Sequence, residues 1–271
     1  MRSLGWQVDL ALTHAPGHAT RMVADQALGK YDGVIAAGGD GSIYEVINGY
    51  YQNPDPNPRP PLGILPLGTG NAFVRDMDLK QEDWQRALEI IDAGRTRGVD
   101  VGRFETGEGV HYFMNILGLG FVADVTETAR RLKMFGNTAY TLGVLYRTIF
   151  LRPYHAKLKL DGSEIERENL FIEISNSRYT SNFLMAPNAR VDDGLLDVTL
   201  LSRLSRRRLL SSFPLILTGD HLQLEEVETF QVKNLTIETD VPKVLTPDGE
   251  LMGSTPLKVC CLNQAVSVFW P

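Results

Sequence analysis

A glycine-rich segment with one acidic residue follows an apolar run in the first third of the chain. The apolar run covers residues 34–37, and a helix is expected from Ile43 onward. Glycines at such a turn let backbone N–H groups approach a ligand without an intervening Cβ, and the helix start adds unpaired donors and a positive dipole. This combination suits phosphate. The segment consists of Gly38, Gly39, Asp40, Gly41 and Ser42.

Asp40 gives this phosphate hypothesis a further requirement. A carboxylate beside phosphate groups repels them unless a cation lies between, so the segment implies Mg²⁺, held directly or through water. The alternative is an ordinary strand-to-helix turn in which Asp40 or Ser42 caps the helix.

A second glycine-rich loop follows another apolar run, residues 62–66. It consists of Gly68, Thr69, Gly70 and Asn71. In open α/β sheets ligands bind at the carboxyl ends of the strands, so two such loops favour one shared nucleotide site over two unrelated turns. Glu45 and Asn48 share a helix face one turn beyond the first loop. For Glu45, a solvated helix position is the alternative.

The elements around these loops predict an α/β domain. Strands are expected at 7–13, 34–37 and 62–66, and helices at 19–28, 43–50 and 83–93. This β-α-β-α-β-α order is typical of an open parallel sheet covered by helices. The prediction places a nucleotide-binding domain in residues 1–100.

The pattern then changes to short strands joined by Asp-Gly or Gly turns, which predicts a mainly antiparallel β-sandwich in residues 101–271. Two helices are expected to interrupt it, at 122–148 and 205–218. The expected strands are 99–104, 110–117, 156–160, 170–175, 195–201, 235–239, 242–245 and 257–262.

Composition excludes several classes of function. The 271 residues carry a net charge of −6, which does not favour nucleic acid. The apolar runs are too short to span a membrane, and the first residues lack a signal-peptide pattern. The two cysteines, Cys260 and Cys261, are adjacent and poorly placed to pair, which fits a reducing cytoplasm. The five histidines show no zinc-ligand spacing.

Five ordered motifs between residues 39 and 257 resemble the diacylglycerol kinase catalytic family and bacterial lipid kinases related to sphingosine kinases. Residues 39–49 are similar to the family pattern GDGT-x-x-E-V-x-N-G, and residues 66–75 to P-x-G-T-x-N-D-F-A-R. Residues 186–198 resemble A-P-x-A-x-x-D-D-G-x-L-D-V. Residues 217–221 resemble L-x-x-G-x-H, and residues 247–257 the closing D-G-E and T-P-L.

The resemblance implies an NAD kinase/diacylglycerol kinase-like fold that transfers the γ-phosphate of ATP to a lipid hydroxyl, with Mg²⁺. ATP would be bound by the two loops and by Glu45 and Thr13. The implied ATP-binding residues are Thr13, Gly38, Gly39, Asp40, Gly41, Ser42, Glu45, Gly68, Thr69 and Asn71.

The resemblance also implies a structural Mg²⁺ held by the Asp193 side chain and by main-chain oxygens near Arg190 and Leu195, although Asp-Gly is equally a hairpin-turn signal. The turn at residues 248–250 would supply the general base that takes the proton of the lipid hydroxyl. Asp248, Glu250 and Asp40 are all candidates, and Asp40 and Asp248 are expected to face one crevice.

The chain departs from the family pattern in two places. The family's first strand and its N-P-x-x-G phosphate loop are absent, and Ala72 stands where bacterial diacylglycerol kinases usually carry Asp. Asp124 matches the Asp with which sphingosine kinases hold the substrate amine. A helix cap or surface ion pair is the alternative for Asp124.

A basic cluster at Arg203 and residues 206–208 precedes the apolar residues 209–215, which fits transient contact with an anionic membrane surface or an ordinary amphipathic helix. We therefore expect a cytoplasmic protein, peripheral to the membrane, and a homodimer is compatible with the sequence. The competing hypotheses are a non-catalytic lipid-binding protein of the same fold and an NAD-kinase-like small-molecule kinase. The lipid acceptor, diacylglycerol-like or sphingoid-like in the favoured interpretation, stays open between diacylglycerol, a sphingoid base, phosphatidylglycerol and a polyprenol.

Overall fold

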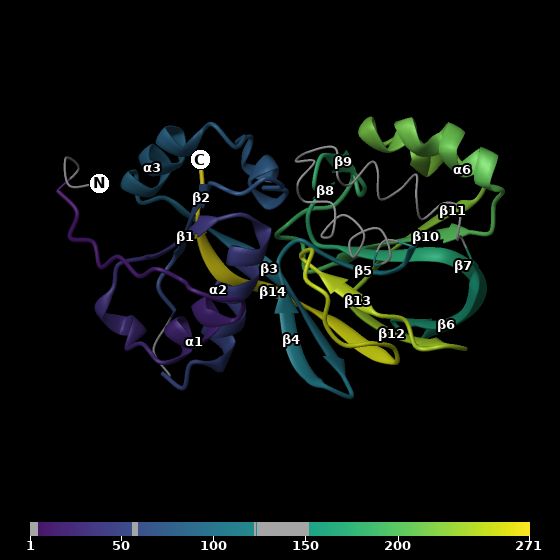
Figure 1. The fold of residues 1–271 in the computed structure, drawn as a ribbon, viewed down its shortest axis with the longest axis horizontal. Coiled ribbons are helices and arrows are strands. Elements are labelled where there is room, and N and C mark those ends of the chain that lie inside the picture. Colours follow the sequence, from purple (N-terminus) through teal and green to yellow (C-terminus); the bar gives the residue numbers. More distant parts are fainter. Residues whose placement is uncertain (1–4, 56–58, 122, 124–151) are drawn as a thin grey trace.

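The computed structural model describes residues 5–55, 59–121, 123 and 152–271. In Figure 1 a helix-rich part containing the N-terminus lies beside a strand-rich part. The helix-rich part contains α1 His18–Ala24, η2 Leu28–Lys30, β1 Val34–Gly38, α2 Asp40–Gln52, β2 Leu62–Pro66, η3 Phe73–Met77 and α3 Trp84–Asp92.

The expected parallel arrangement of the second and third apolar runs is confirmed. β1 and β2 pair in parallel, so both glycine-rich loops leave the same edge of the sheet. α2 begins at Asp40, earlier than the sequence suggested, and buries Ile43, Val46, Ile47 and Tyr50. This is the spacing of one helix face packed on a sheet.

The strand predicted at residues 7–13 is wrong. In the structure this segment is irregular, and Val8, Leu10 and Leu12 are 42%, 81% and 66% exposed. Alternating apolar residues suggested a half-buried strand, but a strand needs a neighbour to satisfy its backbone groups. Within the described residues β1 pairs only with β2, and the segment makes no such pairing.

The strand-rich part is mainly antiparallel. Its elements are β3 Thr96–Thr106, β4 Gly109–Phe113, β5 Ile116–Gly120, β6 Tyr154–Leu160, β7 Ser163–Ser175, β8 Tyr179–Thr180, β9 Phe183–Leu184, β10 Leu196–Ser202, α6 Arg206–Ser212, η5 Phe213–Leu217, η6 Asp220–Gln223, β11 Val227–Val232, β12 Asn234–Thr239, β13 Leu245–Pro247 and β14 Leu257–Phe269. The fold class predicted from the sequence, an α/β domain followed by an antiparallel β-rich domain, is confirmed.

Several element predictions need correction. The strand expected at 110–117 is two strands, β4 and β5, with a break at residues 114–115, and the one expected at 242–245 lies mostly at 245–247. The helix expected at 205–218 is α6 followed by η5, because Pro214, in the first turn of η5, has no backbone N–H to continue the α-helical pattern. No pattern in the sequence predicted β8, β9 or β11. The helix expected at 122–148 lies almost entirely outside the described residues.

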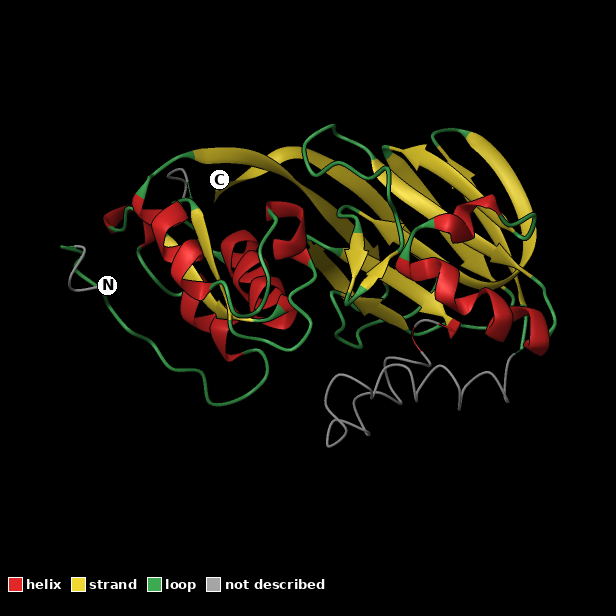
Figure 2. Ribbon diagram, turned by 90° about the horizontal axis from the view of Figure 1, so that it is seen from above, coloured by secondary structure: helices red, strands yellow, loops and turns green. Residues whose placement is uncertain are grey.

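The last strand joins the two parts. β14 pairs with β12 and β3, and its end pairs in parallel with β2 at Val268 and Leu62. Figure 2 shows long strands extending from one part into the other. Leu257, Val259 and Cys261 pack in the core of the strand-rich part, whereas Val266, Val268 and Phe269 pack in the core of the helix-rich part. The division at residue 100 stays a prediction.

Candidate functional site

The two glycine-rich loops pack directly against each other at the end of β1 and β2. The Leu67 N–H donates to the Gly38 carbonyl at 3.0 Å, which continues the parallel pairing beyond the strands. A Cβ added to Gly68 would lie 2.6 Å from the Gly39 nitrogen, and one added to Gly39 would lie 3.2 Å from the Gly68 Cα. Glycine is therefore required for this close backbone approach.

Asp40 joins the first loop to the second. Its two carboxylate oxygens accept hydrogen bonds from the backbone N–H of Ala72, at 3.0 Å, and of Phe73, at 3.2 Å. Burial raises the pKa of Asp40, and these backbone bonds oppose the rise. A Cβ on Gly70 would lie 3.0 Å from the Asp40 carboxylate, so Gly70 also leaves room for it.

Asn71 closes the second loop on itself. Its φ of 46° is in the left-handed region that Asn tolerates better than most residues. The side chain accepts from the Gly68 N–H at 3.1 Å and donates to the Gly68 carbonyl at 2.6 Å. Asn71 is buried, whereas Thr69 at the loop tip is exposed. The structure thus gives Asn71 a role in shaping the loop and leaves Thr69 free to meet a ligand.

Glu45 is turned away from the loops toward α1. Its carboxylate accepts from the Gly17 N–H at 2.8 Å and the Ala19 N–H at 2.9 Å, at the start of that helix. A carboxylate at a helix N-terminus is stabilised by the unpaired donors and the helix dipole. Thr13, the other predicted ATP contact outside the loops, lies in the exposed segment before α1.

Asp248 anchors the turn at residues 248–250 to the strand-rich part. Its carboxylate accepts from the backbone N–H of Met114 at 3.0 Å and from those of Asn115 and Ile116 at 2.9 Å. Burial raises the pKa of Asp248 to about 7, and the negative charge of Asp40 adds to the rise, against the lowering effect of the backbone bonds. The break between β4 and β5 therefore has a physical cause, since these donors turn to Asp248.

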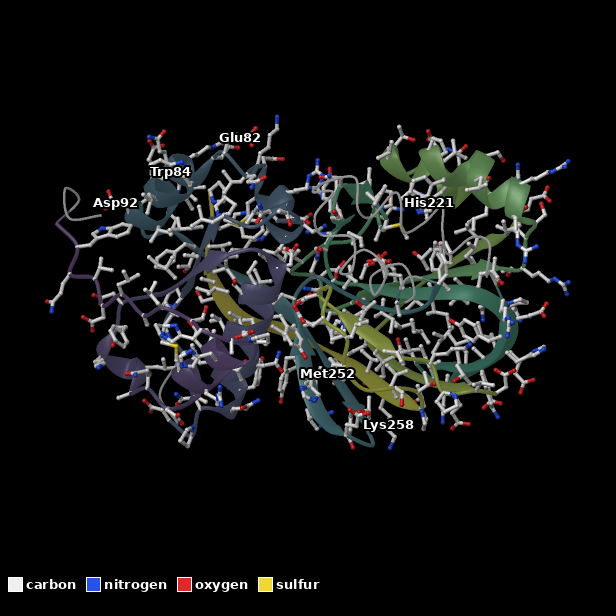
Figure 3. All side chains as sticks on the ribbon, in the orientation of Figure 1. Glu82, Trp84, Asp92, His221, Met252 and Lys258 are labelled. Carbon is white, nitrogen blue, oxygen red and sulfur yellow. The ribbon has the colours of Figure 1, made fainter. Side chains whose placement is uncertain are left out.

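The same turn faces the start of α2. A Cβ on Gly41 would lie 3.1 Å from the Glu250 Oε1, so the Glu250 carboxylate lies over the first turn of this helix. Tyr44 donates from its hydroxyl to the Met252 sulfur at 3.1 Å. Met252 lies between the helix-rich and strand-rich parts in Figure 3.

The carboxylates of this region also act on Tyr44. Burial raises the pKa of Tyr44 first, and the charges of Asp248, Glu250 and Glu45 raise it further. The structure therefore brings the three candidate bases, Asp40, Asp248 and Glu250, to one region beside both glycine loops. The backbone of the glycine loops and the acidic side chains meet there.

The predicted structural metal site lies elsewhere, in the loop before β10. Asp193 is exposed and accepts from the Leu195 N–H at 3.0 Å, as in an Asx turn. The Leu195 carbonyl accepts from the Cys261 sulfur at 3.8 Å, and Arg190 pairs with Asp192 at 3.7 Å. In the described parts of the chain, no group of three or more His, Cys, Asp or Glu side chains is placed to hold a metal. The set proposed from the resemblance uses one carboxylate and main-chain oxygens.

Asp100 supports this loop and was not singled out in the sequence. It is fully buried and accepts from the backbone N–H of Gly194 and of Gln264, each at 2.6 Å. It thus ties the loop to β14. From the sequence alone, a single acidic residue within an expected strand cannot be distinguished from one whose side chain faces solvent. Asp124 lies outside the described residues.

Two family models match the chain and together cover most of it. The diacylglycerol kinase catalytic domain matches residues 1–104, and the YegS C-terminal NAD kinase beta sandwich-like domain matches residues 115–270. The second match alone spans more than half of the chain.

Curated relatives and a solved structure agree with these models. The chain is 32% identical to a diacylglycerol kinase of Mycobacterium tuberculosis over 259 residues, covering 94% of this chain and 82% of the relative. It is 29% identical to that of Bacillus subtilis over 270 residues, covering 98% and 87%. A crystal structure of a diacylglycerol kinase from Bacillus anthracis shares the fold, with a TM-score of 0.72 at 23% identity over 96% of this chain and 83% of the other.

Proposed function

Because the chain belongs to the diacylglycerol kinase family, we propose that it transfers the γ-phosphate of ATP to the hydroxyl of a lipid. The observation that supports this most is the position of the 248–250 turn over the first turn of α2, where Glu250 lies beside Gly41. Phosphoryl transfer needs bound phosphates, neutralised charge and a base within reach of the acceptor. The glycine loops, Asp40 and the turn offer these three.

The triphosphate would lie along the two loops. Backbone N–H groups at the start of α2 and the exposed Thr69 would meet its oxygens. Each Asp40 oxygen accepts one backbone hydrogen bond, which leaves a second lone pair on each oxygen. These hard donors fit Mg²⁺ between Asp40 and the phosphates. When bound there, Mg²⁺ would neutralise charge on the transferring group.

Glu250 is the general base that we propose. Asp248 already accepts three backbone hydrogen bonds, so its geometry suits holding the turn in place. Both oxygens of Asp40 bind the second loop. Glu250 would take the proton of the lipid hydroxyl as that oxygen attacks the γ-phosphate, with ADP as the leaving group.

We also propose that residues 1–100 bind the nucleotide and that residues 101–271 bind the lipid, with Asp193 and the main-chain oxygens of Arg190 and Leu195 holding a structural Mg²⁺. The exposed Asp193 carboxylate and carbonyl oxygens are ligands that Mg²⁺ accepts.

Membrane contact would involve α6. Leu210 is 41% exposed on this helix and Arg207 beside it is exposed, while Arg208 pairs with Glu226 at 3.1 Å. Exposed basic and apolar side chains on one helix suit an anionic lipid surface. In the described parts of the chain, no helix is long and apolar enough to cross a membrane. A lipid substrate would therefore be taken from the membrane surface.

The test is transfer of label from γ-³²P-ATP to lipids in mixed micelles, with products separated by thin-layer chromatography. We expect a labelled lipid phosphate that requires Mg²⁺, and a 10²- to 10⁴-fold loss of kcat in Glu250→Gln, roughly the usual worth of a general base. Glu225→Gln, an exposed acidic position, is the matched control and should leave kcat unchanged. Lipid binding without any labelled product would instead support a non-catalytic lipid-binding protein.

A further inference from the structure

Glu173, near the end of β7, is a buried carboxylate in which one of the two oxygens lacks a hydrogen-bond partner. Its exposed fraction is 1%. Oε1 accepts from the Thr180 hydroxyl at 2.5 Å and from the Ser175 hydroxyl at 3.5 Å, but Oε2 has no hydrogen-bond partner. Among the described residues, no basic side chain contributes to its charge environment. Buried polar groups without a hydrogen-bond partner are energetically costly and rare, which suggests that a donor of a bound ligand pairs with Oε2.

Thr246, in β13, is a second such group. It is 0% exposed, and its hydroxyl has no hydrogen-bond partner. Thr246 lies opposite Gly118 of β5, and Gly118 lies opposite Glu173 of β7. Directly opposed residues project from the same face of a sheet. Two unpaired oxygens therefore stand on one face, two strand spacings or about 10 Å apart at the Cα atoms, with a glycine between them.

This pair lies between the proposed base region and an apolar cluster. Asp248 follows Thr246 by two residues, about 7 Å along the strand. In the opposite direction, Gly120 lies opposite Phe171, and Phe171 opposite Leu201. The apolar cluster that begins there contains Phe121, Leu170, Phe171, Phe183, Met185, Leu201 and Leu209. Along this face of the sheet, the acidic region at Asp248 is followed by the unpaired oxygens of Thr246 and Glu173 and then by the apolar cluster.

We propose that Glu173 and Thr246 bind a second hydrogen-bond donor of the acceptor lipid, a hydroxyl or amine near the hydroxyl that is phosphorylated. The acyl chain would pack on the apolar cluster. This rests on the proposed function and deepens it by naming an acceptor class. Monoacylglycerols and sphingoid bases carry such a donor, whereas diacylglycerol has only the reacting hydroxyl. Sites built for a donor discriminate strongly against analogues that lack it.

A purely structural role explains less. The bond from Thr180 to Glu173 joins the two-stranded sheet of β8 and β9 to β7, which accounts for Oε1 alone. It does not account for Oε2 or for the Thr246 hydroxyl. A structural role would also affect all acceptors equally, so the ratio between acceptors separates the two explanations.

The experiment compares kcat/KM for 1-monooleoylglycerol, sphingosine and 1,2-dioleoylglycerol in mixed micelles. We expect the wild-type protein to prefer one of the first two over dioleoylglycerol by about tenfold or more, as loss of a buried hydrogen bond implies. Thr246→Val should reduce this preference severalfold. Glu173→Gln should reduce a preference for sphingosine more than one for monooleoylglycerol, because an amide oxygen still accepts from a hydroxyl but forms no ion pair with an ammonium. Glu166→Gln, on the exposed part of β7, is the control.

A wild-type preference for dioleoylglycerol, or ratios that both variants leave unchanged, would overturn the inference while leaving the kinase proposal intact. Absence of label in all three lipids would refute the kinase proposal instead. In that case, equilibrium binding of the same lipids decides the inference. Weaker binding of monooleoylglycerol or sphingosine by both variants, with dioleoylglycerol unaffected, supports it, and equal binding overturns it.

Discussion

Replacing Gly68 by Ala tests whether the two glycine loops form one nucleotide site. The added Cβ would lie 2.6 Å from the Gly39 nitrogen and 3.0 Å from the Asn71 Oδ1. Because the nearer atom belongs to the backbone, a side chain cannot move to make room, and the loops must separate. Overpacking of this kind costs about 1–3 kcal/mol. The separation also stretches the bonds from Ala72 and Phe73 to Asp40.

The expected result is a free energy of unfolding lowered by about 1–3 kcal/mol in a urea titration. If ATP binding needs the loops at their wild-type spacing, the same ~1–3 kcal/mol is lost from binding, and because 1.4 kcal/mol is a factor of ten in affinity, ATP binding by isothermal calorimetry should weaken by about fivefold or more. Gly107→Ala is the control, because nothing lies within 4 Å of its added Cβ. Its stability should stay within about 0.5 kcal/mol of the wild type. A Gly68→Ala protein with wild-type ATP affinity would refute the role of this contact.

Two further predictions concern buried polar residues. Asn71→Ala loses both hydrogen bonds to Gly68 and keeps an unfavourable φ, so it should lower the free energy of unfolding in a urea titration by about 2–4 kcal/mol. Asn71→Gly tolerates this φ and should lose about 1 kcal/mol less. Equal losses in the two variants would show that the backbone conformation contributes nothing. Burial raises the pKa of Glu173 to about 7 from 4.5, so the native state binds this proton more tightly and loses stability as pH rises from about 4.5 through 7. Glu173→Gln should therefore be more stable than the wild type by about 3 kcal/mol at pH 8, with the difference vanishing below pH 4.5, and a difference independent of pH would contradict the raised pKa.

The positions of the glycine loops could be predicted from the sequence, whereas the hydrogen-bond partners of individual side chains could not. Both glycine loops follow parallel strands, as predicted. β2 is buried along its whole length, as expected, whereas in β1 only Ala36 is buried and Ala37 is exposed, so the expectation of a buried strand at residues 34–37 is only partly correct. Local patterns of this kind are contained in a few consecutive residues. Glu45 differs, since the motif identifies it but only the structure shows that it receives the N–H groups at the start of α1.

Long-range pairing accounts for what could not be predicted. Val8, Leu10 and Leu12 alternate as a strand does, but the alternation says nothing about whether a neighbouring strand is available. The break between β4 and β5 depends on Asp248, which is more than 130 residues away in sequence. Glu173 and Thr246 lie on one face of the sheet because of the register of three strands, and no short segment of sequence determines that register.

Hydrogen exchange of the full chain with and without Mg²⁺ and ATP tests the central claim most directly. If the triphosphate lies along the two glycine loops and under the 248–250 turn, amide exchange should slow at residues 38–43, 67–73 and 248–250 together. Protection confined to other segments, or of one loop without the other, would contradict a shared nucleotide site at the start of α2.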